Sequence, residues 1–543
     1  MTEVTFTAWP FWMAFACVFM VISIAGQHLS EPRRTPALRK VLMLAFSMGF
    51  YTWVAGQLVA ILVLSVLINH LFTLGLTSTT GRLRQFLVTS AVAFNVGLLG
   101  LFKYAYFVAD WWPNSTLEFA LQSWRLDQWM LPIGLSFFTF QAISYVLDVH
   151  RGTLKAPASL LSFATYLSFF PQLVAGPIVR AGQFLPQLES RSWVPDKYED
   201  RQHIQRILTG FLKKVLIGDF IGAWIVDPVF ADPNAWSSVE IWIALYGYSL
   251  QVYADFSGYT DMAKGMAGLL GIALPENFNR PYKATSPGDF WRRWHITLSA
   301  WWKDYVYIPM GGNRRFSAFS LGCLGMACAA IVWWADNLGV SLVTSGVTML
   351  MMAVMLLYPK ANRRVAHAVN AFLIMLMGGL WHGAHMNFIV WGALNGAVLS
   401  VWIVLPLRSE NAWSRWLGWL VTFHTVVASR IWFRAGSLVH WNEGVGTPHP
   451  KGAWDTAWSI WHALTSSTVE LGNVHWQPTY LAGIALLGIG FGLHFLPEPV
   501  SDALQNRAKK APTWMLWAGW IGATLLSTWA PGTQMRPFIY WQF

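Results

Sequence analysis

The sequence predicts an all-α polytopic membrane protein. Of its 543 residues 55% are hydrophobic and only 12% are charged, and the mean hydropathy is +0.41. A soluble domain carries about a quarter charged residues, whereas a membrane-spanning helix needs about 20 mostly apolar residues. Apolar runs of that length recur along the chain, at 86–108, 130–149, 384–405, 416–433, 478–496 and 512–530. We expect about 12 to 14 hydrophobic segments in all, some of them too short to span fully.

Charge along the chain predicts the orientation of these segments. The first one, 9–26, has no basic region before it and no cleavage site, so we expect it to be retained. Basic clusters alternate with neutral or acidic loops, which by the positive-inside rule puts both termini in the periplasm of a multi-pass inner-membrane protein. The same clusters account for the net charge of +11, so no nucleic-acid partner is expected.

The three cysteines, Cys17, Cys323 and Cys328, lie in apolar stretches and show no Cys/His spacing typical of zinc sites. We therefore predict no disulfide framework, no metal and no permanently bound cofactor.

The middle third interrupts the pattern of spans. Residues 169–177 place two prolines and a glycine in an apolar stretch, which predicts either a re-entrant loop or a Pro-kinked helix. A polar run follows at 255–261, and residues 277–315 are too polar to span. Polar groups at membrane depth mark this section as the working part of the chain.

Residues 290–305 are predicted to form one amphipathic helix in the cytoplasmic interface. Ser286 can cap it, Pro287 suits its first turn and Asp289 completes a capping box. One side of this helix collects a histidine and six large apolar residues: Trp291, Trp294, His295, Leu298, Trp301, Trp302 and Tyr305. The charged residues Arg292, Arg293, Lys303 and Asp304 point the other way. An ionisable ring is thus aimed at the apolar side, where it requires an explanation.

The glycine-rich segment 311–314 follows the predicted helix. Successive glycine amides beside Arg314 and Arg315 can hold a phosphate, but a plain turn is the alternative interpretation.

A second histidine cluster lies 87 residues after His295. Its sequence is Trp381-His382-Gly383, followed by His385, and it falls between two apolar segments. A histidine at membrane depth is costly unless it is used or paired. The residues alone leave three interpretations open for His382: structural hydrogen bonding, a catalytic base, or a metal site shared with His385. Gly383 would leave room for a substrate to approach the ring.

A lone histidine suits acyl transfer to a hydroxyl group. A neutral imidazole can take the alcohol proton during attack on a thioester, a contribution of about 10² to 10⁴ in rate. The sequence has no G-x-S-x-G serine elbow placed for a covalent hydrolase mechanism, so direct transfer or transfer through another hydroxyl group is expected.

At these motifs the chain resembles the membrane-bound O-acyltransferase (MBOAT) family, and within it the bacterial branch that acetylates exopolysaccharides. The resemblance covers most of the chain and is densest at 160–400, where it is carried by 169–177, 255–261, 275–282, 289–299, 302–314 and 379–384. It implies a single domain, with N-terminal helices at 1–157, a catalytic core at 158–400 and C-terminal helices at 401–543. The implied fold is a helical ring around a central tunnel, with re-entrant and interfacial helices.

By the same resemblance, His382 corresponds to the family's catalytic histidine and is expected to act as the base, and His295 corresponds to the assisting active-site position. Tyr540 becomes a possible acyl relay, because the chain ends in an F-x-Y-x-x-F motif. The alternative for this ending is an ordinary aromatic interface anchor. Further substrate or tunnel candidates are Trp294, Arg293, Trp381, Asp255, Asn279, Phe538 and Phe543. For Asp255 and its neighbour Asp261 a packing role is the alternative.

The expected reaction moves an acetyl group from acetyl-CoA or an acylated carrier protein in the cytoplasm to a secreted polysaccharide of the cellulose or alginate type. Expected partners are membrane lipids, a periplasmic acetyltransferase and a polysaccharide synthesis and secretion complex, with the loop 435–477 as a candidate docking surface. Two alternatives remain at this point: D-alanyl transfer to teichoic acid, and a polysaccharide or lipid transporter or flippase, for which the sequence shows no paired repeats.

Overall fold

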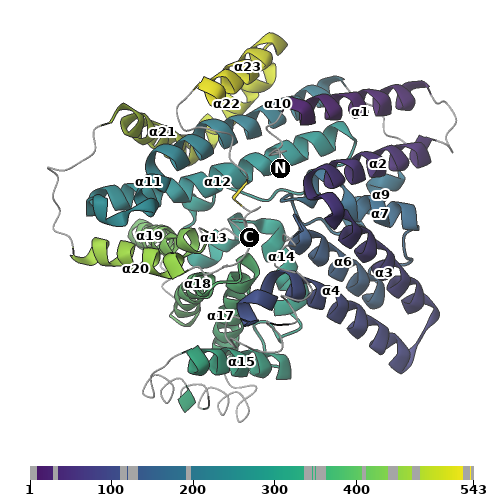
Figure 1. Ribbon diagram of the computed structural model, residues 1–543, viewed down its shortest axis with the longest axis horizontal. Coiled ribbons are helices and arrows are strands. Elements are labelled where there is room, and N and C mark those ends of the chain that lie inside the picture. Colours follow the sequence, from purple (N-terminus) through teal and green to yellow (C-terminus); the bar gives the residue numbers. More distant parts are fainter. Residues whose placement is uncertain are drawn as a thin grey trace. The chain divides into compact units, whose positions relative to one another are not determined.

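Helices make up every regular element of the described chain, as predicted. The structure is a computed structural model, and it describes residues 9–28, 35–109, 119, 132–190, 197–334, 345–346, 349, 363–405, 411–437, 451–466, 477–529 and 538–539 (Figure 1). The chain divides into two compact units. The first unit comprises Met1–Asn277 and Ser437–Phe543, and the second comprises Phe278–Gly436.

Five stretches of the described chain are long and apolar enough to cross a membrane: Ala37–Ser78, Gly81–Ala105, Arg363–His382, Met386–Val404 and Pro478–Phe495. This confirms a multi-pass membrane protein. The larger number of spans expected from the sequence stays a prediction, because several helices, such as α6 (Leu135–Arg151) and α23 (Thr513–Trp529), have only 17 residues.

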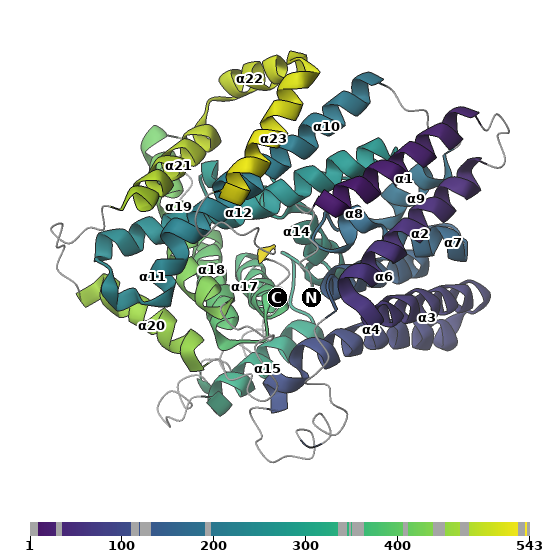
Figure 2. The same ribbon diagram turned by 45° about the horizontal axis from the view of Figure 1, so that its top comes forward.

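The first unit begins with four long apolar helices and a bundle of shorter ones around them. In chain order these are α1 (Trp9–His28), α2 (Thr35–Ala55), α3 (Val59–Ser78), α4 (Gly81–Ala109), α6, α7 (Leu160–Ser168), α8 (Phe170–Leu173) and α9 (Ala181–Glu189). Helices α3, α4 and α6 pack side by side (Figures 1 and 2). The exposed faces of α3 and α4 are rich in large apolar side chains, as lipid contact requires, whereas α6 is almost wholly buried.

The proline-containing stretch 169–177 is an interruption and not a kinked helix. The helical backbone breaks at Phe169 between α7 and α8 and stays irregular from Val174 to Arg180. Protein groups satisfy the interrupted backbone: the Gln172 side chain donates to the Tyr166 carbonyl at 2.8 Å, and the Tyr166 hydroxyl donates to the Val179 carbonyl at 2.7 Å. The break is therefore buried within protein, the condition under which such backbone is tolerated at membrane depth.

Helix α12 (Ser238–Leu269) is the longest helix of the first unit. A capping box between Ser237 and Glu240 starts it. The helix runs without a break through the polar stretch 255–261, alongside α10 (Lys197–Leu212) (Figure 2). Gly210 and Gly258 allow this approach, because a Cβ on either one would collide with the facing backbone.

The remaining helical segments of the first unit are the π-helical turns η3 (Lys213–Asp219) and η4 (Gly222–Val226), then α11 (Asp227–Ala231), α20 (Lys451–Ser466), α21 (Pro478–Phe495), α22 (Glu498–Lys510) and α23. Short 3₁₀ turns connect several of them.

The second unit is built around an antiparallel pair, α17 (Arg363–His382) and α18 (Met386–Val404), joined by a three-residue turn (Figure 1). Gly379 and Gly392 lie at the crossing, where a Cβ on either would strike the backbone of the other helix. Small residues let membrane helices approach this closely. The unit also contains α13 (Pro287–Arg293), α14 (Ile296–Trp302), η7 (Lys303–Tyr307), α15 (Ala318–Trp334) and α19 (Ala412–Gly436).

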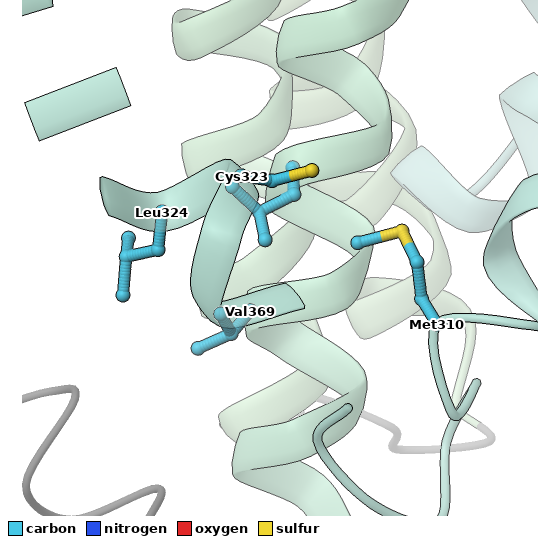
Figure 3. Close-up of a cluster of buried hydrophobic side chains, with 5 residues drawn as sticks. Met310, Cys323, Leu324 and Val369 are labelled. Atoms are coloured by element: carbon cyan, nitrogen blue, oxygen red, sulfur yellow. The ribbon is translucent and has the colours of Figure 1, made fainter. Parts of the chain in front are cut away.

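A small apolar cluster joins α15 to the first half of α17. Its buried members are Met310, Cys323, Leu324, Val369 and Leu373 (Figure 3). Beside it, the buried Asn370 amide donates to the carbonyl of Gly312 at 2.7 Å and accepts from Ser320 at 3.0 Å. These contacts attach the end of the η7 region to the helix that carries His382.

Candidate active site

The predicted single helix at 290–305 is wrong: the backbone breaks at His295. Helix α13 ends at Arg293, and α14 starts at Ile296. Between them Trp294 is extended, with φ −100° and ψ 128°, and His295 is left-handed, with φ 42° and ψ 56°. The predicted N-cap of α13 is confirmed, since the Ser286 hydroxyl accepts a hydrogen bond from the Asp289 backbone amide at 3.2 Å. This bond is one of the two that make up the predicted capping box.

The left-handed conformation of His295 is costly for a residue with a Cβ. Such a position costs about 1 to 3 kcal/mol and persists only where the surroundings impose it. Here a backbone bond from the Asn279 amide to the Arg293 carbonyl, at 2.9 Å, holds the end of α13. Apart from glycines, only His295 and Arg280 have positive φ in the described chain. Strain of this kind at a histidine is a physical reason to suspect function.

The break leaves the predicted separation of faces largely intact. Trp294, Leu298 and Trp301 are buried, whereas Arg292 and Lys303 are exposed. The apolar residues therefore cover the interior of the second unit although two short helices, and not one, carry them.

His295 itself is 2% exposed and surrounded by rings. It stacks on Phe278 at 6.5 Å between ring centroids and meets Trp381 edge-on at 6.2 Å. Burial disfavours the charged imidazolium and lowers the pKa of His295 to about 3. The ring is therefore neutral at physiological pH.

His382 ends α17 and is 5% exposed. Its ring packs edge-on against three aromatic rings: Trp381 at 4.9 Å, Trp391 at 5.0 Å and Phe433 at 5.1 Å. The side chains come from α17, α18 and α19, so three helices position this imidazole. A helix C-terminus carries partial negative charge, which favours any positive charge that forms on the ring.

Trp381 joins the two histidines. Its ring contacts both His295 and His382. Two histidines separated by 87 residues are thus brought to a single tryptophan within the second unit.

One expectation about the neighbours of His382 needs correction, and one of the open interpretations loses support. Gly383 does not leave room for a substrate, because a Cβ there would collide with the Phe388 ring. His385 is not placed as a metal ligand shared with His382, because its Nδ1 accepts the Asn387 amide at 3.1 Å and caps α18. Within the described ranges, no group of three or more His, Cys, Asp or Glu side chains could hold a metal. Burial also lowers the pKa of His385, to about 4.

The glycines at 311–312 form a plain turn. The Gly311 amide donates to the Ile308 carbonyl at 3.0 Å, and the Gly312 amide donates to the Tyr307 carbonyl at 2.9 Å. Both amides end a helical turn and are not available to a phosphate.

The other candidates of the second unit fall into two groups. Trp294 is 3% exposed and stacks on Phe290 at 5.7 Å, within the ring cluster. Arg293 is partly exposed and pairs with Asp289 at 2.9 Å, and Asn279 is exposed, with its backbone tied to Arg293. Trp294 thus lies beside the histidines, while Arg293 and Asn279 make contacts that hold the end of α13.

Asp255 and Phe538 lie together in the first unit. The Asp255 carboxylate pairs with Lys214 at 2.9 Å and accepts the Ile539 amide at 3.0 Å. Phe538 is fully buried against Tyr259, with ring centroids 4.4 Å apart. Both predicted residues thus meet at the C-terminal motif, whereas Tyr540 and Phe543 lie outside the described residues.

The sequence interpretation missed Arg430 of α19. This side chain is 2% exposed, and its guanidinium lies over the rings of Trp294, at 5.0 Å, and Phe433, at 5.3 Å. A signal was present: Arg430 falls inside the apolar run 416–433, and an ionisable residue at membrane depth is a candidate for function.

Comparison with known proteins identifies similar chains. A family model described as "MBOAT, membrane-bound O-acyltransferase family" matches residues 153–327. The probable alginate O-acetylase of Pseudomonas aeruginosa is 34% identical over 505 residues, 92% of this chain and 83% of that protein. The peptidoglycan O-acetyltransferase of Helicobacter pylori is 31% identical, over 78% of this chain and 76% of its own. The teichoic acid D-alanyltransferase of Bacillus subtilis is 27% identical, over 54% of this chain and 66% of its own.

Proposed function

Because the chain belongs to the membrane-bound O-acyltransferase family and is a multi-pass O-acyltransferase, we propose that it moves an acetyl group from a cytoplasmic thioester across the inner membrane, for O-acetylation of a secreted exopolysaccharide. The observation that carries this proposal is the convergence of His295 and His382 on Trp381. The relatives named as alginate and peptidoglycan O-acetylating enzymes support a polysaccharide acceptor. An alginate-type or cellulose-type polymer is the proposed substrate class.

In the proposed mechanism His382 is the base. A hydroxyl oxygen attacks the thioester carbonyl carbon and passes its proton to His382, while the carbonyl electron pair moves onto oxygen. The tetrahedral intermediate then collapses, the carbon–sulfur bond breaks, and the imidazolium returns the proton to the departing thiolate. The position of His382 at the C-terminus of α17 favours the transient imidazolium.

His295 assists as a neutral ring. A neutral imidazole donates one N–H, which can bind the carbonyl oxygen of the acyl group. The low pKa of His295 keeps this donor uncharged across the physiological range. The left-handed backbone at this residue accompanies the contact of its ring with Trp381, which also contacts the proposed base.

Tyr540 is the proposed carrier of the acetyl group on its way outward. Its phenol oxygen would attack the thioester carbonyl carbon and lose its proton to His382, and the carbon–sulfur bond would break as the thiol leaves with that proton, forming an aryl ester. A polymer-bound or partner hydroxyl would then attack this ester, and its proton would pass to the departing phenolate and restore the phenol. Support comes from its neighbours, since Phe538 is buried against Tyr259 and the Ile539 amide binds Asp255. These contacts hold the chain immediately before Tyr540.

The proposal extends to setting and partners. The donor is acetyl-CoA or an acylated carrier protein, both termini face the periplasm of the inner membrane, and a periplasmic acetyltransferase and the polysaccharide synthesis and secretion complex complete the reaction. D-alanyl transfer to teichoic acid is less well supported, because the D-alanyltransferase relative covers little more than half of this chain.

A vesicle assay tests the proposal. The purified chain is reconstituted with isotopically labelled acetyl-CoA, or with labelled acetyl carrier protein, on one side and a soluble polysaccharide with a periplasmic acetyltransferase on the other. We expect label in the polymer with the wild-type chain and none with His382→Ala. Transport of polymer without any labelled ester, or label from a D-alanyl donor alone, would contradict the proposal. A fully active Tyr540→Phe chain would exclude the relay and leave the rest intact.

A further inference from the structure

Arg430 is an ionisable side chain that nothing in the proposed mechanism uses. It lies on α19 one turn before Phe433, and it is 2% exposed. A buried guanidinium keeps its charge under all physiological conditions, so it requires compensation within the protein.

The described part of the second unit does not supply an anion for this charge. Its carboxylates are Asp289 and Asp304, and neither forms an ion pair with Arg430. Among the described residues, the Nε and Nη1 atoms of Arg430 have no hydrogen-bond partner. The contacts that it does make are with ring faces, those of Trp294 and Phe433. Ring faces compensate positive charge in part, but they are poor acceptors for the N–H groups.

The same two rings belong to the histidine site. Trp294 is the residue before His295, and Phe433 packs edge-on against His382 at 5.1 Å. Arg430 therefore contacts one ring that also contacts His382 and the ring of the residue that precedes His295. The Arg430 guanidinium lies 5.3 Å and the His382 ring 5.1 Å from the centre of the Phe433 ring, so both groups border the same aromatic side chain. An oxyanion donor acts at about 3 Å from its oxygen.

From this arrangement we infer that Arg430 is a further catalytic residue, whose guanidinium binds the oxyanion that forms on the acyl carbonyl oxygen during transfer. This inference rests on the proposed acyl transfer. When the hydroxyl oxygen bonds to the carbonyl carbon, the carbonyl electron pair becomes a negative charge on oxygen, and an N–H group of the Arg430 guanidinium, on Nε or on Nη1, donates to it. Collapse of the intermediate returns that pair to the carbonyl as the thiolate leaves. No proton passes through Arg430.

The inference separates the roles of three groups. His382 moves the proton, His295 donates a neutral N–H, and Arg430 supplies positive charge in a site that excludes water. Preorganised charge of this kind acts on the transition state more than on the bound substrate, so its loss lowers kcat more than it raises KM.

The test compares four chains in the vesicle assay with labelled acetyl-CoA and acetyl carrier protein: wild type, Arg430→Met, Arg430→Lys and the control Arg415→Met. Arg415 is exposed on the same helix, so the control removes a charge from α19 outside the site. Size-exclusion chromatography in detergent gives the amount of folded protein to which each rate is normalised.

We expect Arg430→Met to lower kcat by about 10² to 10³, the usual loss for one oxyanion donor, with KM changed much less. Arg430→Lys keeps the charge without the planar fork and should retain part of the rate. Arg415→Met should behave as wild type. Should Arg430→Met fail to fold, Arg430→Lys decides, and it must then show a lowered kcat for each folded molecule.

A normal kcat in folded Arg430→Met, or in Arg430→Lys when the methionine variant does not fold, overturns the inference and leaves acyl transfer standing. A wild-type chain that transfers no acetyl group from either donor overturns the proposed function and this inference together.

Discussion

The two units treat their buried charges in opposite ways. In the first unit, Lys214 lies between Asp219 and Asp255, at 2.5 and 2.9 Å, and all three are almost fully buried. In the second unit two histidines and an arginine are buried against aromatic rings: His295 against Trp381, His382 against Trp391, and Arg430 against Trp294. One arrangement pairs opposite charges within the protein, while the other places nitrogen-bearing side chains against aromatic rings.

The comparison assigns roles. Ion pairs with short distances and complete burial fix the positions of helices, and removal of one partner leaves a stranded charge. Asp261 repeats the pattern, since Lys213 and Arg206 both bind it, and its pairing supports the packing interpretation. In the proposed mechanism the buried groups of the second unit act on a substrate instead.

The largest expected effect is that of His382→Ala on activity. Loss of the base should lower kcat by about 10² to 10⁴, with little change in the amount of folded protein. Acetyl transfer in vesicles measures the rate.

Asp261→Asn is the matched variant in the first unit. It should reduce the thermal stability of the chain in detergent and leave the rate of each folded molecule close to wild type. An unstable His382→Ala chain with a normal rate, together with a stable but inactive Asp261→Asn chain, would contradict the roles assigned to the two units.

Lys214→Met should have the largest effect on stability. It strands two buried carboxylates, Asp219 and Asp255, at a cost of about 3 to 5 kcal/mol in the free energy of unfolding. Denaturant unfolding in detergent measures the loss. The triple variant that also carries Asp219→Asn and Asp255→Asn should recover much of it, because no stranded charge remains. Equal stability of wild type and Lys214→Met would show that the cluster does not hold the first unit together.

Two glycines of the second unit provide a matched pair. Gly383→Ala should destabilise by about 1 to 3 kcal/mol, because the added methyl group collides with the Phe388 ring. Gly378→Ala on α17 meets nothing within 4 Å and should be neutral or stabilising by up to about 1 kcal/mol. Thermal unfolding midpoints separate them. An active, stable Gly383→Ala chain would mean that this space is open after all.

The smallest expected effect is a pH dependence that His295 contributes to stability. Its pKa is about 3 in the folded chain and about 6.5 in an unfolded one. The unfolded chain therefore binds the proton more readily, so this stability is fully present above pH 6.5 and is lost as the pH falls towards 3. The loss amounts to at most about 1.4 kcal/mol per pH unit. Unfolding midpoints at pH 7.5 and 5.5 should differ less in His295→Gln than in wild type; an equal difference in both chains would contradict the burial of a neutral ring.

The helical class and the location of the site could be predicted because both leave strong signals. Apolar runs of bilayer length specify helices, and histidines in such surroundings are rare enough to stand out. The division of residues 290–305 into buried and exposed faces was also predicted correctly, since periodicity reports burial.

The break at His295 could not be predicted. No glycine or proline marks it, and two helices of seven residues each preserve an apolar stripe across a single left-handed residue. The pairing of Lys214 with Asp255 is also invisible in sequence order, because α12 and the η3 turn meet only through tertiary packing. Arg430, in contrast, left a signal in the sequence that was misinterpreted. Its place near the end of an apolar run resembles that of an ordinary cation flanking a membrane span.

The central claim is that His295 and His382 form one site across Trp381, and a double-mutant cycle tests it most directly. The rate of acetyl transfer per folded molecule is measured for wild type, His295→Ala, His382→Ala and the double variant. Residues that act as a unit have strongly non-additive effects. The double variant should therefore be no slower than His382→Ala by more than about tenfold. Losses that multiply in full, or a single variant with wild-type activity, would contradict the claim.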